Sequence, residues 1–259
     1  MAGIIDPWAV GGAYPADVTT PAAPLRDRPE LTGVWGLPEN LLSEALLATL
    51  PANLAPAPWD CVCSAVVWTE RGGSAAAASL AAPLRGRRAL AVTGGLVQYE
   101  STPVGPYGEA LALVAGLEGR RPWVSVPFMA VDSPASLVGG RTNWALPKSL
   151  AAFEGTPGHD RTVVARGVDD VAHGDWEITT SVRPLGPAVP VRTRVTMLQE
   201  FPAEGLGRCP MTASGRVRPA LITVTVRSSG RLGTVLRGGR RLGAVVESSR
   251  FTLGEPAFA

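Results

Sequence analysis

From residue 59 onward the chain is a succession of short segments rich in β-branched residues, and this pattern restricts the fold more than any other feature. Gly, Pro, Asp or Ser separate the segments, which span residues 61–68, 89–100, 109–118, 123–131, 162–168, 176–185, 191–201, 220–227 and 244–253. The chain has 30 Gly and 24 Pro, which indicates many turns, and it shows no βαβ alternation, internal repeat or linker. We therefore expect a mainly β (α+β) single domain of antiparallel strands with a few short helices.

The region before these strands has a different character. Residues 1–30 are rich in Pro, Ala and Asp and predict an extended N-terminal arm, so the β-rich domain would cover residues 31–259. Residues 39–50 carry apolar positions at helical spacing between two prolines and predict one amphipathic helix. Residues 73–84 fit either a helix or a low-complexity loop. Residues 132–153 predict a short capped helix that returns to a strand.

Composition excludes several classes of protein. Hydrophobic residues make up 46% of the chain, so it is globular rather than disordered. The formal net charge of +2 is too small to indicate nucleic-acid binding. No stretch reaches the roughly 20 apolar residues that a membrane helix needs. The first residues lack a basic segment and a long apolar run, so we expect no signal peptide and a cytoplasmic protein.

Cysteines and histidines argue against a disulfide framework and a metal site. Cys61 and Cys63 lie two positions apart on an expected strand, where they share a face and are poorly placed to bond each other. The two histidines, His159 and His173, lie in expected turns, whereas a catalytic zinc usually takes three protein ligands. Phosphate-loop, dinucleotide and nucleophile-elbow motifs are also missing from the sequence. We therefore expect no metal site.

Lys148 is the only lysine among the 24 basic residues of the chain. Arginine replaces lysine for charge but not for amine chemistry, because its guanidinium stays protonated. One alternative is compositional, since a GC-rich genome depletes lysine codons. The neighbourhood favours function: Lys148 follows Trp144, Leu146 and Pro147 in an apolar stretch, where burial favours a neutral, nucleophilic amine.

Glu109 is a second candidate, at the entry of an expected strand after Pro106, Tyr107 and Gly108. A carboxylate at that point would carry protons or accept a hydrogen bond from substrate. The alternative is an ordinary glutamate in a surface turn.

Together these segments resemble the acetoacetate decarboxylase family. The resemblance is carried by residues 103–109, 126–133 and 139–148, and it covers about residues 59–155. It implies a closed, cone-like antiparallel β-barrel, a homo-oligomer, a β-keto acid or related carbonyl substrate, no added cofactor, and a lysine that forms a Schiff base. By position, it implies Lys148 as nucleophile and Glu109 as its acidic partner.

The resemblance also implies residues that bind substrate. They are Tyr107, Met129 and Trp144 along the cavity and an arginine for the substrate carboxylate, either Arg71 or Arg141, the latter also fitting a structural part of its turn. Two positions depart from the family pattern. Ser149 replaces the second lysine that follows the nucleophile, and Thr142 stands where the family often has Glu.

Three functions remain open from the sequence. The first is decarboxylation of a β-keto acid through an imine at Lys148. The second keeps the imine but leads to an aldolase-dehydratase or a cyclase-type tailoring enzyme of secondary metabolism, a direction favoured by Ser149. The third is a binding protein without catalysis, in which Lys148 is a counter-ion for an apolar ligand.

Overall fold

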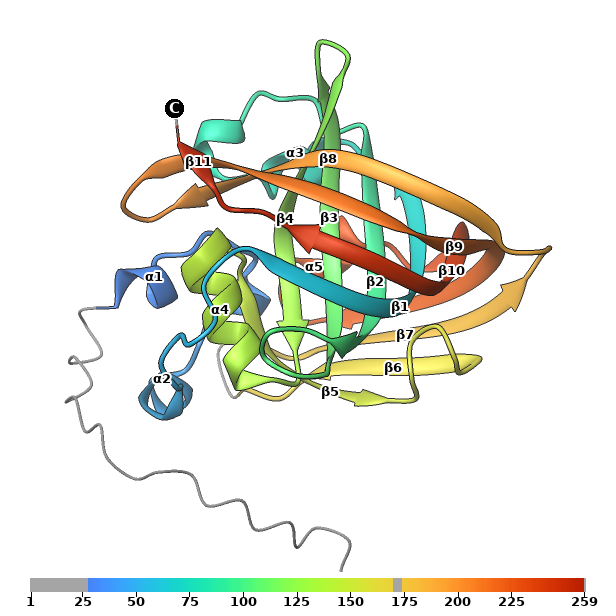
Figure 1. Ribbon diagram of the computed structural model, residues 1–259, viewed down its shortest axis with the longest axis horizontal. Coiled ribbons are helices and arrows are strands. Elements are labelled where there is room, and N and C mark those ends of the chain that lie inside the picture. Colours follow the sequence, from blue (N-terminus) through green and yellow to red (C-terminus); the bar gives the residue numbers. More distant parts are fainter. Residues whose placement is uncertain (1–27, 170–173, 259) are drawn as a thin grey trace, which may run out of the picture.

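One large sheet organises the structure, a computed structural model that describes residues 28–169 and 174–258 (Figure 1). Within these residues its strands are β1 (Trp59–Arg71), β2 (Ala91–Ser101), β3 (Tyr107–Glu118), β4 (Arg121–Val131), β5 (Lys148–Glu154), β6 (Thr162–Gly167), β7 (Trp176–Pro184), β8 (Val189–Phe201), β9 (Gly205–Ser228), β10 (Gly239–Leu253) and β11 (Ala257–Phe258). The helical elements are α1 (Pro29–Thr32), η2 (Pro38–Asn40), α2 (Glu44–Thr49), α3 (Ser74–Ala78), η3 (Ala82–Leu84), α4 (Pro134–Trp144) and α5 (Leu232–Val235). The prediction of a mainly β fold with short helices is confirmed.

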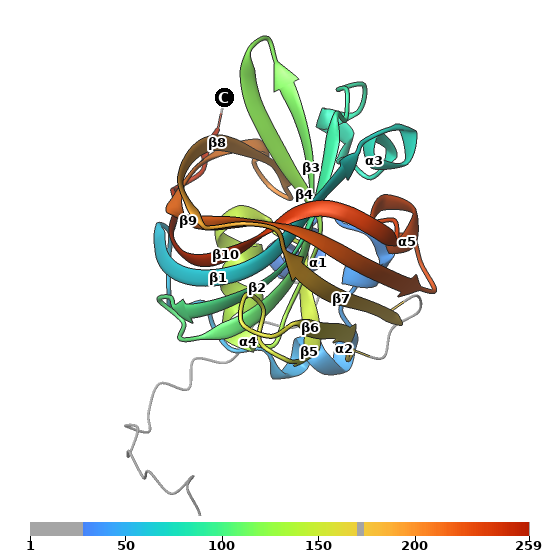
Figure 2. The ribbon, with the colours of Figure 1, turned by 90° about the vertical axis from the view of Figure 1, so that its right-hand side faces the viewer.

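The strand order brings the two ends of the sheet together. Strands pair in the order β10-β1-β2-β3-β4-β5-β6-β7-β9, and β9 also pairs with β10, so the sheet curls around (Figure 2). However, β4 runs parallel to both β5 and β8. The expectation of purely antiparallel strands is therefore wrong at β4, and the sheet is not an even barrel. Helix α4 joins β4 to β5, and a helical crossover permits the parallel pairing that a hairpin forbids.

Side chains alternate between the two faces of a strand, and both faces of the central strands are buried. On β3, Ala110 and Ala112 point to one face, whereas Glu109 and Leu111 point to the other and line a cavity. The same alternation continues on β4, where Phe128 and Met129 point to opposite faces. Strands buried on both sides explain the nearly continuous apolar runs in this part of the sequence.

Two hydrophobic clusters occupy the two faces of the sheet. The filled cluster contains only apolar carbon-rich side chains, among them Val66, Trp68, Leu96, Phe128 and Ile178, and helices α3 and α5 add to it. The cavity cluster, to which helices α1 and α4 contribute, includes Trp59, Cys61, Tyr107, Met129 and Leu146. Figure 1 shows α4 beside the ends of β4 and β5, and its Leu137, Val138 and Trp144 belong to the cavity cluster.

The predicted helix over residues 39–50 is wrong in extent. It is divided into η2 and α2, with Leu41 extended between them. Ser43 caps α2 by accepting a hydrogen bond from the Leu46 amide, which fixes the start of that helix. Asn40 is held instead by its side-chain amide, which donates to the Met129 carbonyl at 2.6 Å. These side-chain hydrogen bonds override the apolar spacing.

Other predicted elements agree better. Residues 73–84 form the short helices α3 and η3, and residues 132–153 form capped helix α4 followed by β5. The predicted arm of residues 1–30 falls outside the described residues except for its last three, of which Pro29 and Glu30 begin α1. Among the described helices, none has the length and apolar character to span a membrane.

Candidate active site

A tight turn after helix α4 points Lys148 into the interior. Ser133 caps the start of α4 by accepting from the Ser136 amide. The helix ends with Ala145 in the left-handed region at a φ of 50°. The amide of Lys148 then donates to the Leu146 carbonyl at 2.7 Å across Pro147, whose fixed φ suits so narrow a turn. Lys148 is thereby the first residue of β5, opposite Met129 of β4.

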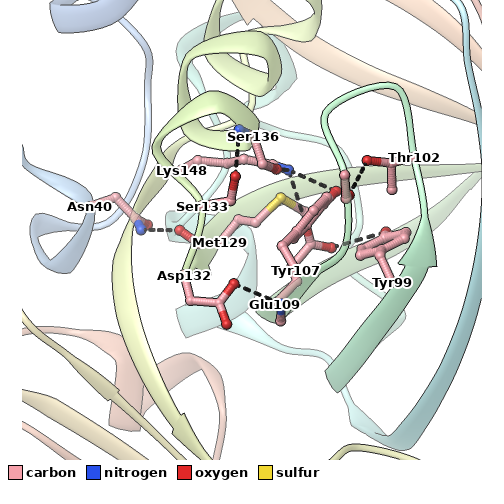
Figure 3. A network of polar contacts seen from close by, with 12 residues as sticks. Asn40, Tyr99, Thr102, Tyr107, Glu109, Met129, Asp132, Ser133, Ser136 and Lys148 are labelled. Carbon is pink, nitrogen blue, oxygen red and sulfur yellow. Dashed lines mark hydrogen bonds and ion pairs between the residues drawn. The ribbon is translucent and has the colours of Figure 1, made fainter. Parts of the chain in front are cut away.

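Lys148 and Glu109 form a buried ion pair at the centre of the site (Figure 3). The Nζ atom of Lys148 lies 3.0 Å from Oε2 of Glu109, and both side chains are nearly inaccessible to water, at 3% and 2% exposed. The amine also donates to Oγ of Ser136 at 2.9 Å and lies 3.4 Å from the Tyr107 hydroxyl oxygen. The predicted nucleophile and acidic partner, 39 positions apart in the sequence, thus meet in space.

Two tyrosines complete the polar network. Tyr99 donates its hydroxyl to Oε1 of Glu109 at 3.2 Å, and its ring packs against Tyr107 with centroids 4.5 Å apart. Burial, reinforced by the Glu109 carboxylate, raises the pKa of Tyr99 and Tyr107 well above the usual value. Both phenols therefore remain neutral and serve as hydrogen-bonding groups rather than as charges near neutral pH.

Gly140 and Arg141 of helix α4 contact the side-chain stem and the backbone of Lys148. A methyl group on Gly140 would lie 2.5 Å from Cδ of Lys148, so the lysine stem uses the space that a glycine leaves. Arg141 donates from Nε to the Lys148 carbonyl at 2.6 Å, and its two Nη atoms donate to the carbonyls of Leu31 and Asn40. Burial lowers the pKa of Arg141 to about 9, which still leaves it charged at neutral pH.

Neither predicted arginine reaches the amine site. Arg141 donates to three backbone carbonyls, which agrees with its alternative interpretation as a structural part of the turn. Arg71 lies exposed at the end of β1, outside the residues that line the cavity. Sequence spacing could not reveal this, because it does not fix which strand end faces the lysine.

Ser149 faces away from Lys148, because neighbouring strand residues point to opposite faces. Its hydroxyl accepts a hydrogen bond from Nδ2 of Asn40 at 3.1 Å, and the side chain is buried. Ser149, the position that departs from the family pattern, therefore helps to hold Asn40 between β4 and β5 and does not line the cavity.

A cavity of about 210 Å³ opens in front of the lysine. The predicted Tyr107, Met129 and Trp144 all line it. Trp144 packs edge-on against Trp59 with ring centroids 5.1 Å apart, and both indole N–H groups donate to backbone carbonyls, so their apolar rings face the cavity. The site is thus an amine and a carboxylate at the base of an apolar chamber.

Sequence reasoning missed several groups at this site. Tyr99, Cys61 and Cys63 line the cavity, and Ser136 contacts the amine. The shared face of Cys61 and Cys63 was a usable signal, as was the position of Tyr99 two residues after Val97 on an expected strand. No pattern singled out Ser136. Burial, together with the nearby Glu109 carboxylate, raises the pKa of both thiols to about 12, so they remain protonated.

A wider depression of about 480 Å³ lies on the open surface, lined in part by His159, Arg161 and Arg183. His159 is exposed there, and Arg218, another residue of the depression, pairs with Glu247. Among residues 28–169 and 174–258, no group of three or more His, Cys, Asp or Glu side chains is arranged to hold a metal ion. His173 lies outside the described residues.

The fold and site define a mostly β protein with a single buried amine beside a carboxylate. Residues 44–230, most of the chain, match the acetoacetate decarboxylase family. The chain belongs to this family, as the resemblance in the sequence predicts.

Several solved structures share the fold. Acetoacetate decarboxylase from Legionella pneumophila subsp. pneumophila str. Philadelphia 1 is 13% identical, with a TM-score of 0.52 over 82% of this chain and 92% of that one. The enduracididine biosynthesis enzyme MppR in complex with pyruvate is 15% identical, with a TM-score of 0.53 over 80% and 92%. An acetoacetate decarboxylase-like enzyme from Sphingomonas wittichii RW1 is 15% identical, with a TM-score of 0.50 over 80% and 94%. At these identities the likeness establishes the fold alone. Comparison with curated protein sequences gives no significant match.

Proposed function

We propose that this protein is an enzyme in which Lys148 forms a Schiff base with the carbonyl carbon of a small substrate. The observation that carries the proposal is the Lys148–Glu109 pair, 3.0 Å apart and buried at the base of an apolar cavity. A buried ion pair is weak as a stabilising device, since desolvation offsets much of its attraction. An amine beside a proton acceptor in a cavity is, however, what nucleophilic lysine chemistry requires.

In this mechanism Glu109 first takes a proton from the Lys148 ammonium across their hydrogen bond. The charged pair becomes a neutral pair, a change that apolar surroundings favour. The free amine attacks the carbonyl carbon, and water leaves as the imine forms. The hydroxyls of Ser136 and Tyr107, already within reach of Nζ, hold the amine in place. Glu109 then returns the proton, and the protonated imine draws electrons from the adjacent carbon.

The bond that breaks next defines the reaction. Loss of carbon dioxide would give the decarboxylation predicted first from the sequence, whereas loss of a proton would lead to aldol, dehydration or cyclisation chemistry. MppR, which shares the fold, has been solved with pyruvate bound, which supports a carbonyl substrate. A keto-acid substrate, the homo-oligomer and a role in secondary metabolism stay predictions from the resemblance. The cytoplasmic location stays a prediction from the residue pattern.

Reductive trapping tests the proposal. Three separate incubations each contain the protein, borohydride and one carbonyl compound, namely acetoacetate, pyruvate or 4-methylpentan-2-one. The adduct is located by intact mass and peptide mapping. Because Lys148 is the only lysine, only the α-amino group competes with it. We expect a stable adduct at Lys148 with at least one of these compounds, and none at that position in Lys148→Arg.

Glu109→Gln separates proton transfer from simple binding. We expect it to slow trapping by about a hundredfold or more, the usual scale of general acid–base catalysis. An equal loss of substrate binding, with the trapping rate at saturation unchanged, would make Glu109 a substrate anchor. No adduct from any of the three compounds would favour the binding protein that forms no imine.

A further inference from the structure

The charges in the cavity are already balanced without a ligand. Among the described residues that line it, Lys148 and Glu109 are the charged ones, and they neutralise each other at 3.0 Å. When a ketone or an aldehyde becomes a protonated imine at Lys148, this balance is kept, because the positive imine replaces the ammonium. A keto acid brings one further negative charge into the same buried space.

The hydrogen-bond donors of the lining are also largely occupied. The Tyr99 hydroxyl donates to Glu109, and the indoles of Trp59 and Trp144 donate to backbone carbonyls. The Ser249 hydroxyl lies 3.3 Å from a backbone carbonyl that accepts from it. A buried carboxylate is tolerated when strong donors or a cation compensate it, and these donors are already used.

The Tyr107 hydroxyl accepts from Lys148 at 3.4 Å, so its own O–H is one donor near the amine. Cys61 and Cys63 remain as thiols, whose S–H groups are weak donors. The polar groups nearest the amine thus suit the single oxygen of a carbonyl better than a carboxylate.

The walls beyond the amine are apolar and adaptable. Met129, Met197 and Met211, which are all the methionines after Met1, line this one cavity. Methionine side chains are flexible and polarisable, so they adjust to apolar ligands of different shapes. Half-buried Leu111 and Val246 continue the apolar lining toward solvent.

The size of the cavity limits the ligand. An empty apolar cavity of about 150 Å³ admits benzene, with six carbon atoms. By that scale the volume of about 210 Å³ in front of Lys148 holds roughly eight non-hydrogen atoms. Such a molecule is larger than acetone and comparable with a branched or short-chain ketone.

We propose that the substrate of this site is an uncharged ketone or aldehyde with an apolar alkyl or aryl body. This inference rests on the proposed imine at Lys148 and specifies what that imine is made from. The amine adds to the carbonyl carbon, and the carbonyl oxygen leaves as water. Glu109 then removes a proton from the adjacent carbon, and the electron pair of that C–H bond forms the enamine. The reaction therefore continues by proton transfer or by aldol-type formation of a carbon–carbon bond at the enamine, and it releases no carbon dioxide.

A matched pair of ligands tests the substrate class. In 4-methylpentan-2-one an isopropyl group replaces the carboxylate of acetoacetate with nearly the same shape, so the two differ mainly in charge. Both are titrated into the full-length protein, and binding is followed by tryptophan fluorescence, since Trp59 and Trp144 line the cavity. We expect the ketone to reach half-saturation at a concentration at least tenfold lower than acetoacetate does.

Several outcomes would overturn the inference. They are half-saturation by acetoacetate at an equal or lower concentration, saturation by neither compound, and carbon dioxide released from acetoacetate at a rate that Lys148→Arg abolishes. Reductive trapping is measured separately. A preference for the ketone without any adduct would contradict imine formation at Lys148 but support an uncharged ligand. An adduct together with a preference for acetoacetate would support imine formation and contradict an uncharged ligand.

A charge placed on the cavity wall provides a second test. Met211 is half-buried and lines the cavity, so Met211→Arg adds a cation within reach of a ligand carboxylate. We expect this variant to lose the preference for the ketone by at least tenfold relative to the control Met211→Leu, which keeps the wall apolar. An unchanged preference in a folded Met211→Arg protein would contradict the charge-balance argument.

Discussion

The two hydrophobic clusters share the same strands but differ in content. The filled cluster contains no sulfur and no charge among its described members, and Phe128 packs edge-on against Trp176 with ring centroids 5.0 Å apart. The cavity cluster includes three cysteines and, with the half-buried Met211, three methionines, and it surrounds the Lys148–Glu109 pair and an open volume. Two neighbouring residues of β4, Phe128 and Met129, belong to opposite clusters.

This difference assigns stability and chemistry to alternate residues of one strand. Residues on the filled face remove apolar area from water and contact other side chains on all sides. Residues on the cavity face border empty space and hold two desolvated charges. We expect substitutions on the filled face to lower stability and substitutions on the cavity face to change ligand binding and reactivity.

The largest expected effect on stability separates Phe128 from Met129. Phe128→Ala leaves a cavity in a filled region, so we expect its free energy of unfolding to fall by about 3–5 kcal/mol. Met129→Ala enlarges a cavity that already exists, and we expect a loss below about 2 kcal/mol, because packing there is incomplete. Urea unfolding of both variants measures this. Equal losses would show that the two faces are not distinct.

Breaking the ion pair comes next in size. Lys148→Met leaves the Glu109 carboxylate buried without its partner, so we expect it to cost about 3 kcal/mol of unfolding free energy at neutral pH. The double variant Lys148→Met with Glu109→Gln removes both charges, and we expect it to recover most of this loss. Urea unfolding of the two single variants and the double variant completes the cycle. A double variant as unstable as the single ones would mean that the pair itself stabilises the fold.

Gly140 tests how finely the lysine is held. In Gly140→Ala the new methyl group meets Cδ and Cε of Lys148, a flexible stem that shifts at little cost in stability. The shift moves Nζ away from Glu109 and Ser136, so we expect reductive trapping to slow by about tenfold, near 1.4 kcal/mol in activation free energy. Gly233→Ala in α5 is the matched control, because a methyl group there meets open space. A slower reaction in both variants, or a large loss of melting temperature in Gly140→Ala, would argue against a positioning role.

The smallest expected effect concerns the cavity thiols. Because burial raises the pKa of Cys61 and Cys63 to about 12, only about one thiol in ten thousand is ionised at pH 8. We expect iodoacetamide to label them slowly in the folded protein, about tenfold faster for each pH unit, and rapidly after denaturation. Fast labelling near pH 8 in the folded state would contradict this burial.

The same thiols give a sign for the dependence of stability on pH. Their pKa is higher in the folded state than in the unfolded chain, so the unfolded chain releases protons first as the pH rises. We expect their contribution to be fully present below about pH 8 and to be lost progressively between about pH 9 and pH 12. Melting temperatures measured across this range check the direction.

The sequence predicted those parts of the fold and site that depend on local pattern. Strand segments, the capped helix before Lys148 and the separation between Glu109 and Lys148 are visible as residue types at defined spacing. The parallel pairing at β4 was not, because strand direction depends on which helix crosses the sheet. Arg71 was misplaced for a related reason: a position at a strand end does not specify the cavity that it faces.

Other features depend on contacts between distant segments. The side chain of Asn40 donates to the Met129 carbonyl and to the Ser149 hydroxyl. Because of these long-range contacts, the observed helix is shorter than the predicted one. Ser136 reaches the amine because α4 folds back over β5, a geometry that residue spacing does not encode. The role of Gly140 likewise emerges only when the lysine stem is seen to pass beside it.

The most direct test of imine formation uses the single lysine as its own label. Protein grown with ¹⁵N-lysine carries one labelled side-chain nitrogen, that of Lys148. It is mixed with 4-methylpentan-2-one labelled with ¹³C at the carbonyl, without any reducing agent. We predict a one-bond coupling between this nitrogen and the labelled carbon, which requires a covalent bond between them, and a carbon chemical shift typical of an imine rather than of a carbinolamine. A lysine signal that shifts on saturation without such coupling would show that the cavity binds its ligand without chemistry at Lys148.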